Sequence, residues 1–181
     1  MVDENHTEPH MAPLVAFVNR LRERYPDGYV PHFDKNDGGV NAEILFLYAK
    51  PGKMTCPNEG GSGLISQDNN DRTANATKDF LAKADIDRKK IAIWNTISAW
   101  NGNSKITPIE KKYSVEEFQE LLSIVRCIVL VGREAQQTQN KDKVFLSRYK
   151  VLESFLPSPR VEKIYPHKYW GIPDIWRQAN Q

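Results

Sequence analysis

Several side chains that could bind or activate a ligand come directly after short apolar runs of this 181-residue chain. Lys50 follows the run that begins at Glu43, and Asn95 follows Ile93-Trp94. A lysine supplies a positive charge, and a carboxamide supplies one acceptor and two donors to a polar ligand. The ordinary alternatives are a lysine that points to solvent and an asparagine that hydrogen-bonds its own turn.

Two proline-containing loops and one long connection carry further candidates. Pro51-Gly52 and Pro157-Ser158 each end an apolar run and predict tight loops. Backbone N–H groups and hydroxyls in such loops bind phosphate well, and Ser158 would add a donor. Asp68 and Asn69 lie in a long connection, where their side-chain oxygens could hold a water molecule. Ordinary turns and helix caps would explain these residues as well.

Alternating elements must position these residues. The predicted strands are Glu43–Ala49, Lys90–Trp94, Cys127–Val131 and Lys150–Phe155. The predicted helices are Ala12–Arg24, Thr73–Ala84, a helix that starts at a Ser114/Glu117 capping box, Arg133–Gln139 and Asp174–Ala179. This alternation predicts an α/β fold, a three-layer sandwich in which helices flank a four-stranded, mostly parallel sheet. Because ligands of such sheets bind at the carboxyl ends of the strands, the candidate loops should converge on one site.

Composition sets the remaining bounds. Residues 1–11 are polar and predict a flexible tail, and residues 12–181 predict a single domain. The net charge is only +2, although the second half of the chain carries a basic surplus that could contact phosphate or be a solvated surface. No apolar run approaches the roughly 20 residues of a membrane span, so we expect no membrane partner and a cytoplasmic monomer. Cys56 and Cys127 are too few for a disulfide framework or a thiolate metal site, so we expect no metal and no cofactor.

The order of the loop motifs resembles the uracil-DNA glycosylase superfamily, in particular its small bacterial family 4-like members. Tyr48-Ala49-Lys50-Pro51-Gly52 stands where that superfamily has its first motif. Ile93-Trp94-Asn95-Thr96 matches the mid-chain strand that ends in a base-reading Asn, and Leu156-Pro157-Ser158-Pro159 stands in place of the closing His-Pro-Ser-Pro. The segments 61–66 and 68–71 resemble the part that lines the base pocket.

The resemblance implies a DNA glycosylase that flips a nucleotide out of DNA and excises uracil or a modified pyrimidine, leaving an abasic site. It assigns reading of the base to Asn95. Asp68 and Asn69 are the candidate catalytic substitutes for the missing water-holding group, and Lys50 could stabilise a departing anionic base. The resemblance assigns substrate binding to Ala49, Pro51, Gly52, Leu64, Leu156, Pro157 and Ser158. The carboxamide of Asn95 can pair with N3–H and O4 of uracil or, rotated by half a turn, with N3 and N4–H₂ of cytosine.

This chain departs from the superfamily at the positions that matter for catalysis. Ala49 and Lys50 occupy the places before Pro51 where a carboxylate or Asn is common, and Leu156 replaces the closing His. Leu64 stands where an aromatic residue commonly stacks on the base. These replacements leave two alternatives within the superfamily: a pocket enlarged for a bulky, phage-type pyrimidine, or a catalytically inactive DNA-binding member. An unrelated α/β hydrolase or transferase is the third reading, and the chain lacks a nucleophile elbow and a Gly-Lys-Ser phosphate loop.

Overall fold

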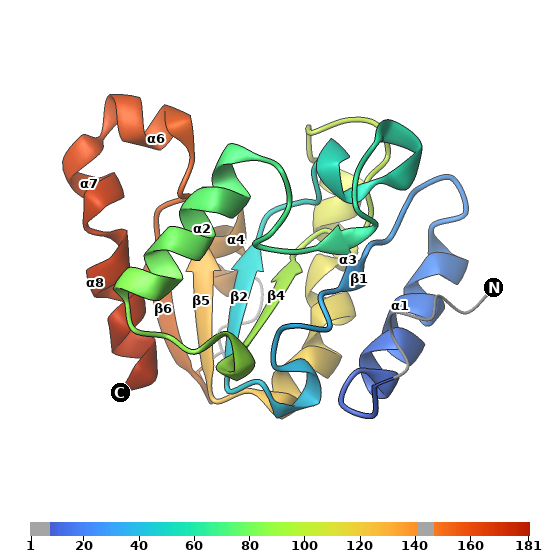
Figure 1. The fold of residues 1–181 in the computed structure, drawn as a ribbon. Coiled ribbons are helices and arrows are strands. Elements are labelled where there is room, and N and C mark those ends of the chain that lie inside the picture. The colour runs from blue at the N-terminus through green and yellow to red at the C-terminus, as the bar shows by residue number, and fades with distance from the viewer. Residues whose placement is uncertain (1–7, 141–146) are drawn as a thin grey trace.

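The centre of the protein is a four-stranded sheet, drawn in Figure 1 from the computed structural model, which describes residues 8–140 and 147–181. Its strands are β2 (Ile44–Tyr48), β4 (Ile91–Asn95), β5 (Cys127–Val131) and β6 (Lys150–Ser154). They lie in the order β4-β2-β5-β6, and every neighbouring pair is parallel. The predicted α/β fold and the four predicted strands are confirmed.

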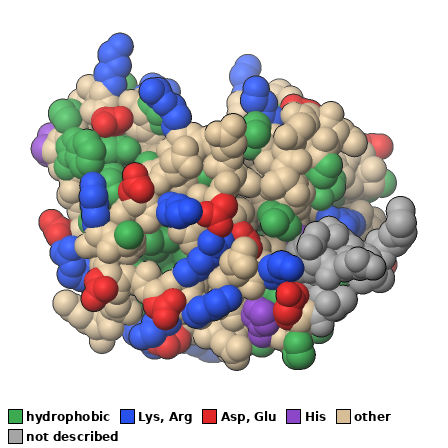
Figure 2. All heavy atoms as spheres, in the orientation of Figure 1, with side chains coloured by type: hydrophobic (Ala, Val, Ile, Leu, Met, Phe, Trp, Pro, Cys, Tyr) green, Lys and Arg blue, Asp and Glu red, His purple; other side chains and the backbone are tan. Residues whose placement is uncertain are grey.

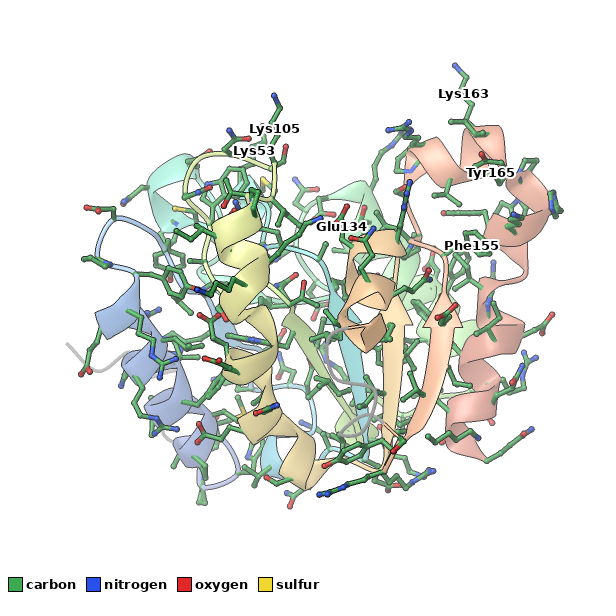
Figure 3. All side chains as sticks on the ribbon, turned by 180° about the vertical axis from the view of Figure 1, so that it is seen from behind. Lys53, Lys105, Glu134, Phe155, Lys163 and Tyr165 are labelled. Carbon is green, nitrogen blue, oxygen red and sulfur yellow. The ribbon has the colours of Figure 1, made fainter. Side chains whose placement is uncertain are left out.

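Helices lie on both faces of this sheet and complete the predicted sandwich. The helix α2 (Arg72–Lys83) lies on the near face in Figure 1, and α8 (Ile172–Arg177) packs against α2 and β6. The helices α3 (Pro108–Phe118) and α4 (Arg133–Gln136) lie on the opposite side, which faces the viewer in Figure 3. The inner strands are therefore buried on both faces, which is why they are nearly continuous apolar runs.

Aromatic rings join the layers. Trp176 of α8 packs edge-on against Phe46 of β2, with ring centroids 4.9 Å apart, and also contacts Phe80 of α2. Near the other edge of the sheet, Trp94 of β4 stacks on Phe33 with a centroid separation of 4.2 Å. Both tryptophans are fully buried, so they hold the layers together and are not available to stack on a base.

The predicted helices are confirmed with shifted ends. The helix α1 (Ala12–Arg24) has the predicted bounds, and Asp71 caps α2 by accepting a hydrogen bond from the Ala74 N–H at 2.9 Å. The last helix begins at Ile172 rather than Asp174, because Pro173 is tolerated in a first turn.

The start of α3 differs from the prediction. The helix begins at Pro108, and the capping box is formed by Thr107 and Glu110, whose carboxylate accepts the Thr107 N–H at 2.7 Å. Glu117, which the predicted box required, is buried and accepts hydrogen bonds from the hydroxyls of Ser98 and Tyr25. A tertiary contact therefore uses the carboxylate that the local pattern assigned to a cap.

Several elements are too short for a hydrophobic period to reveal them. They are the paired strands β1 (His32–Phe33) and β3 (Leu64–Ile65), and the helices α6 (Pro159–Ile164) and α7 (Pro166–Trp170). Short 3-10 helices lie at Gly39–Asn41, Lys53–Thr55, Pro57–Glu59, Arg88–Lys90, Gln119–Ile124, Gln137–Asn140 and Gln178–Asn180. The segments Lys53–Thr55 and Pro57–Glu59 follow β2 at the carboxyl end of the sheet, whereas Gly39–Asn41, Arg88–Lys90 and Gln119–Ile124 precede strands at its amino end.

The predicted tail at residues 1–11 is wrong for its last part. Residues 1–7 lie outside the described residues, but Met11 is fully buried in the main core. The carbonyl oxygen of His10 accepts a hydrogen bond from the Val40 N–H at 3.0 Å. Burial of the apolar Met11 side chain stabilises the fold. The polar residues before Met11 led to the prediction of a tail that included it.

We expect Met11→Ala to lower the free energy of unfolding by about 2–5 kcal/mol, because it leaves a cavity in a packed core. The control is Pro9→Ala, which changes an exposed residue of the same segment and should be close to neutral. Urea unfolding of both variants measures the difference. Equal stability of the two variants would show that Met11 is not part of the core.

Candidate functional site

A cavity of about 430 Å³ lies at the carboxyl ends of β2 and β4. Its lining residues come from four parts of the chain. They are Tyr48–Thr55, then Ile65–Gln67 with Asn69, Asp71, Thr73, Ala74 and Thr77, then Ile93 and Asn95, and finally Leu156. The volume falls within the range of roughly 300–1,000 Å³ that is typical of ligand sites. The position is the one that an open parallel sheet offers to ligands.

The surface at this end of the molecule is hollowed and flanked by basic side chains. Figure 2 shows a notch between two raised parts, each of which carries Lys or Arg side chains. In Figure 3, Lys53 and Lys105 lie on one side of the notch, and Lys163 of α6 lies on the other. All three lysines are exposed, so they place positive charge along both rims.

Asn95 is the last residue of β4 and pairs in register with Tyr48 of β2. Only 4% of Asn95 is exposed, and its side chain lines the cavity. Within the described residues its carboxamide makes no hydrogen bond, including to its own turn. The amide atoms of Asn95 are not among the fully buried polar atoms that lack a partner, so they are accessible from the cavity, and Asn95 presents its donors and acceptor to whatever enters it.

Lys50 lines the cavity with its stem, but its ammonium group is occupied. The Nζ atom donates to Glu110 Oε1 at 2.8 Å, to Asn101 Oδ1 at 2.9 Å and to the Lys105 carbonyl oxygen at 3.0 Å. The side chain is only 3% exposed. Lys50 therefore joins the end of β2 to the loop before α3, and the placement does not fit the expected role of a cation facing the base.

Lys50→Met should lower the free energy of unfolding by about 3 kcal/mol, because it leaves the Glu110 carboxylate buried without its partner. The double variant Lys50→Met/Glu110→Leu should recover most of that loss, since both charges are then removed. Lys53→Met is the matched control at an exposed lysine and should change stability little. Chemical denaturation compares the four proteins, and an unchanged Lys50→Met would contradict the assignment.

The two residues expected to hold water have other partners. Asp68 is not among the residues that line the cavity, and ion pairs with Lys78 and Arg88 hold the pKa of its carboxyl below the usual range. Asn69 does line the cavity, but its Oδ1 accepts from the Ser62 hydroxyl at 2.6 Å and its Nδ2 donates to the Leu64 carbonyl oxygen at 2.9 Å. Asn69 thus braces its own loop.

The expected substrate-binding residues divide into two groups. Ala49, Pro51, Gly52 and Leu156 line the cavity, while Leu64, Pro157 and Ser158 are not among the lining residues. Ile65 takes the place expected of Leu64, because successive side chains of a strand point to opposite faces. The Ser158 hydroxyl accepts from the Val161 N–H at 3.4 Å as the N-cap of α6. Its oxygen is therefore engaged in a local cap.

The first turns of α2 supply Thr73 and Thr77, which were not expected at the site, and Asp71, which belongs to the segment 68–71 that the resemblance expected to line the base pocket. Asp71, Thr73 and Thr77 lie on the side of α2 that faces the cavity. The Tyr48 and Thr77 hydroxyls are 2.7 Å apart, and Thr77 also donates to the Thr73 carbonyl oxygen at 2.8 Å. The spacing of these residues is helical, and the Asp71 cap was the signal that could have located this face.

A buried network supports the wall made by residues 66–69. Arg88 donates to Asp34 and Asp37, both at 2.7 Å, and to Asp68 at 2.5 Å. The Ser66 hydroxyl donates to the same oxygen of Asp34. Burial raises the pKa of Asp37 to about 7, while Arg88 opposes this shift and the nearby Asp34 carboxylate adds to it. Three carboxylates share one guanidinium, so protonation of Asp37 relieves repulsion.

The raised pKa of Asp37 predicts that stability falls as the pH rises. The folded state binds this proton more tightly, so the contribution is fully present below the ordinary pKa of 3.8 and is lost as the pH approaches 7. The loss is at most about 4 kcal/mol. Between pH 4 and 7 the unfolding free energy of the wild type should therefore fall relative to that of Asp37→Asn. Exposed Asp27→Asn is the control, and parallel profiles for all three proteins would contradict the assignment.

Within the described ranges 8–140 and 147–181, no group of three or more His, Cys, Asp or Glu side chains is placed to hold a metal ion. None of the helices in those ranges combines the length and apolar character needed to cross a membrane. The absence of a metal from the reaction stays a prediction.

The chain matches no protein-family model, and no curated protein matches its sequence. Among solved structures it is similar to a protein from Methanosarcina acetivorans whose solution NMR structure is described as that of a "putative Uracil DNA glycosylase". The two chains share 14% sequence identity with a TM-score of 0.47. The similarity covers 78% of this chain and 93% of the other.

Proposed function

We propose that this protein is a DNA glycosylase that excises uracil or a modified pyrimidine by cleaving the N-glycosidic bond. The observation that carries the proposal is the carboxamide of Asn95, which is almost fully buried, lines the cavity and has no partner among the described residues. An amide that faces a cavity with no protein partner can bind a ligand that has a matching donor and acceptor edge. A pyrimidine base has such an edge.

In this proposal the target nucleotide rotates out of the DNA, and its base enters the cavity between apolar walls. Ile65 and Ile93 supply apolar surface, and Asn95 bonds the Watson–Crick edge. Hydrogen bonds from Asn95 to the base strengthen as negative charge develops on the departing ring, so the same residue selects the base and assists its departure.

The rims of the notch suit the phosphates on either side of a flipped nucleotide. Lys53 and Lys105 on one side and Lys163 on the other can each contact an anionic strand (Figure 3). The added Cβ of any larger residue at Gly52 would meet no atom within 4 Å, so the backbone there is open to a ligand. Such contacts position DNA and carry no information about the base.

The apolar residues at two motif positions favour a base larger than uracil. Ala49 and Leu156 line the cavity where the resemblance expects a carboxylate or Asn and a His. They leave room near the base and remove polar groups, which suits a bulky 5-substituted pyrimidine. The same replacements also favour the second candidate function, a DNA-binding protein that recognises a flipped pyrimidine and does not cleave it.

The test is excision from oligonucleotides that carry cytosine, thymine, uracil or a bulky 5-substituted pyrimidine, read out as alkali-labile abasic sites. We expect Asn95→Ala to lower excision of the best substrate by about 100-fold or more, because it removes donors that act on the departing base. Asn75→Ala changes an exposed amide of α2 and is the control.

Full activity of Asn95→Ala would remove Asn95 from the mechanism. Binding of DNA with an extruded pyrimidine, with no excision of any base, would favour the non-cleaving candidate instead. A wild-type protein that neither binds DNA with an extruded pyrimidine nor excises any base would overturn the proposed function.

A further inference from the structure

Asp71 places a carboxylate on the wall of the cavity. It is the N-cap of α2, and its Oδ1 accepts the Ala74 N–H at 2.9 Å. Within the described residues, no hydrogen bond or ion pair engages its second oxygen, Oδ2. Asp71 is half-buried and lines the cavity. One oxygen thus fixes the side chain, and the other is available to a ligand.

The other carboxylates around the cavity are paired with cations. Asp34 and Asp37 bind Arg88, and Asp68 binds both Arg88 and Lys78. Glu110 binds Lys50. Among the described residues that line the cavity, Asp71 is the only one with an acidic side chain. The negative charge that a ligand meets in this cavity is therefore that of Asp71.

The Asp71 carboxylate lies at the amino end of α2 and lines the same cavity as Asn95. The amino end of α2 presents unpaired N–H groups and a positive dipole end to its cap. Burial and, in smaller part, the charge of Asp71 raise the pKa of the Tyr48 hydroxyl, which hence stays protonated. Tyr48 pairs in register with Asn95. Because the charge of Asp71 acts on Tyr48, the Asp71 carboxylate and the Asn95 carboxamide lie at the same end of the sheet.

We propose that Asp71 is the catalytic carboxylate of this site, which stabilises the positively charged sugar of the transition state and orients the attacking water. The proposal rests on the proposed glycosylase function and gives it the acid that the first loop lacks at Ala49 and Lys50. Its ligand class is a cationic five-membered sugar ring in DNA.

The step balances without any further reactant. The bond between C1′ of the sugar and N1 of the pyrimidine breaks, and its electron pair leaves with the base, whose negative charge Asn95 stabilises. The water oxygen forms a bond to C1′, which becomes the hydroxyl-bearing carbon of the abasic sugar. The water gives up one proton to the Asp71 carboxylate, and that proton passes to the base, which leaves neutral.

The experiment uses abasic-site analogues, because they do not require the base to be known. Duplexes that differ only in a cationic pyrrolidine or a neutral tetrahydrofuran at one position are bound to the wild-type protein. We expect the wild type to bind the cationic duplex about tenfold or more tightly, because an ionised carboxylate in a cavity attracts it. Asp71→Asn should reduce that ratio to near one and lower excision by about 100-fold.

The variants are chosen so that folding is not the cause. Asparagine and serine cap helices about as well as aspartate, so Asp71→Asn and Asp71→Ser should keep the thermal midpoint of the wild type. Asp87→Asn is the matched control, since Asp87 also accepts a backbone N–H as a cap but is not among the residues that line the cavity. It should keep both the ratio and the activity.

The outcomes separate this proposal from the one it rests on. A wild type that binds neither analogue and excises no base overturns the proposed function and the role of Asp71 together. A wild type that prefers the cationic duplex, with the same preference in Asp71→Asn and Asp71→Ser, overturns the role of Asp71 alone. Loss of the preference in both folded variants, with Asp87→Asn unchanged, supports it.

Discussion

The parallel pairing of β2 with β4 and β5 is the constraint on which the rest of the molecule depends. It brings Tyr48 and Asn95 to the same edge of the sheet as partners in register. The pairing is stable because the strands carry apolar side chains on both faces and helices bury those faces. Once all strands run in one direction, the loops that follow them meet at one end, and the cavity forms there.

The walls of the cavity are held by ion pairs. Arg88 gathers the carboxylates behind the segment 66–69, and Lys50 joins the end of β2 to Glu110 on α3. A charge that is buried in such a pair is unavailable to a ligand, and its loss is costly for the fold. Only cavity side chains outside these ion pairs are therefore available to a ligand. The proposed reaction uses two of them, Asn95 and Asp71.

Asn95 is almost fully buried, but its amide atoms are accessible from the cavity and no protein group in the described residues engages them. The sheet fixes this arrangement, because the backbone of Asn95 is part of β4 and its neighbours are buried. A ligand with a complementary edge would bind these groups without displacing a protein partner. This is a physical reason for a site to lie at Asn95, and it is independent of the motif order that suggested the family.

The sequence by itself determined the elements whose patterns are strong. Burial of whole faces requires apolar runs in β2 and β5 and helical spacing of the apolar residues in α1. Such patterns can be recognised directly in the sequence. Asn95 was also predictable, because a residue at the end of a parallel strand can only face the ligand edge or its own turn. Asp71 was predictable as a cap and as part of the segment 68–71 expected to line the pocket, although the sequence did not show that its second oxygen has no partner.

Only the tertiary structure decided which polar groups are free. Lys50 and Asp68 looked like site residues because of their loops, but partners distant in sequence, Glu110 and Arg88, engage their charges. Leu64 and Ile65 are adjacent in the chain, and the pairing of β3 with β1 settled which of them faces the cavity. Sequence pattern reports on local periodicity and burial. The partner of a charge depends on which segments the fold brings together, and no local pattern contains that information.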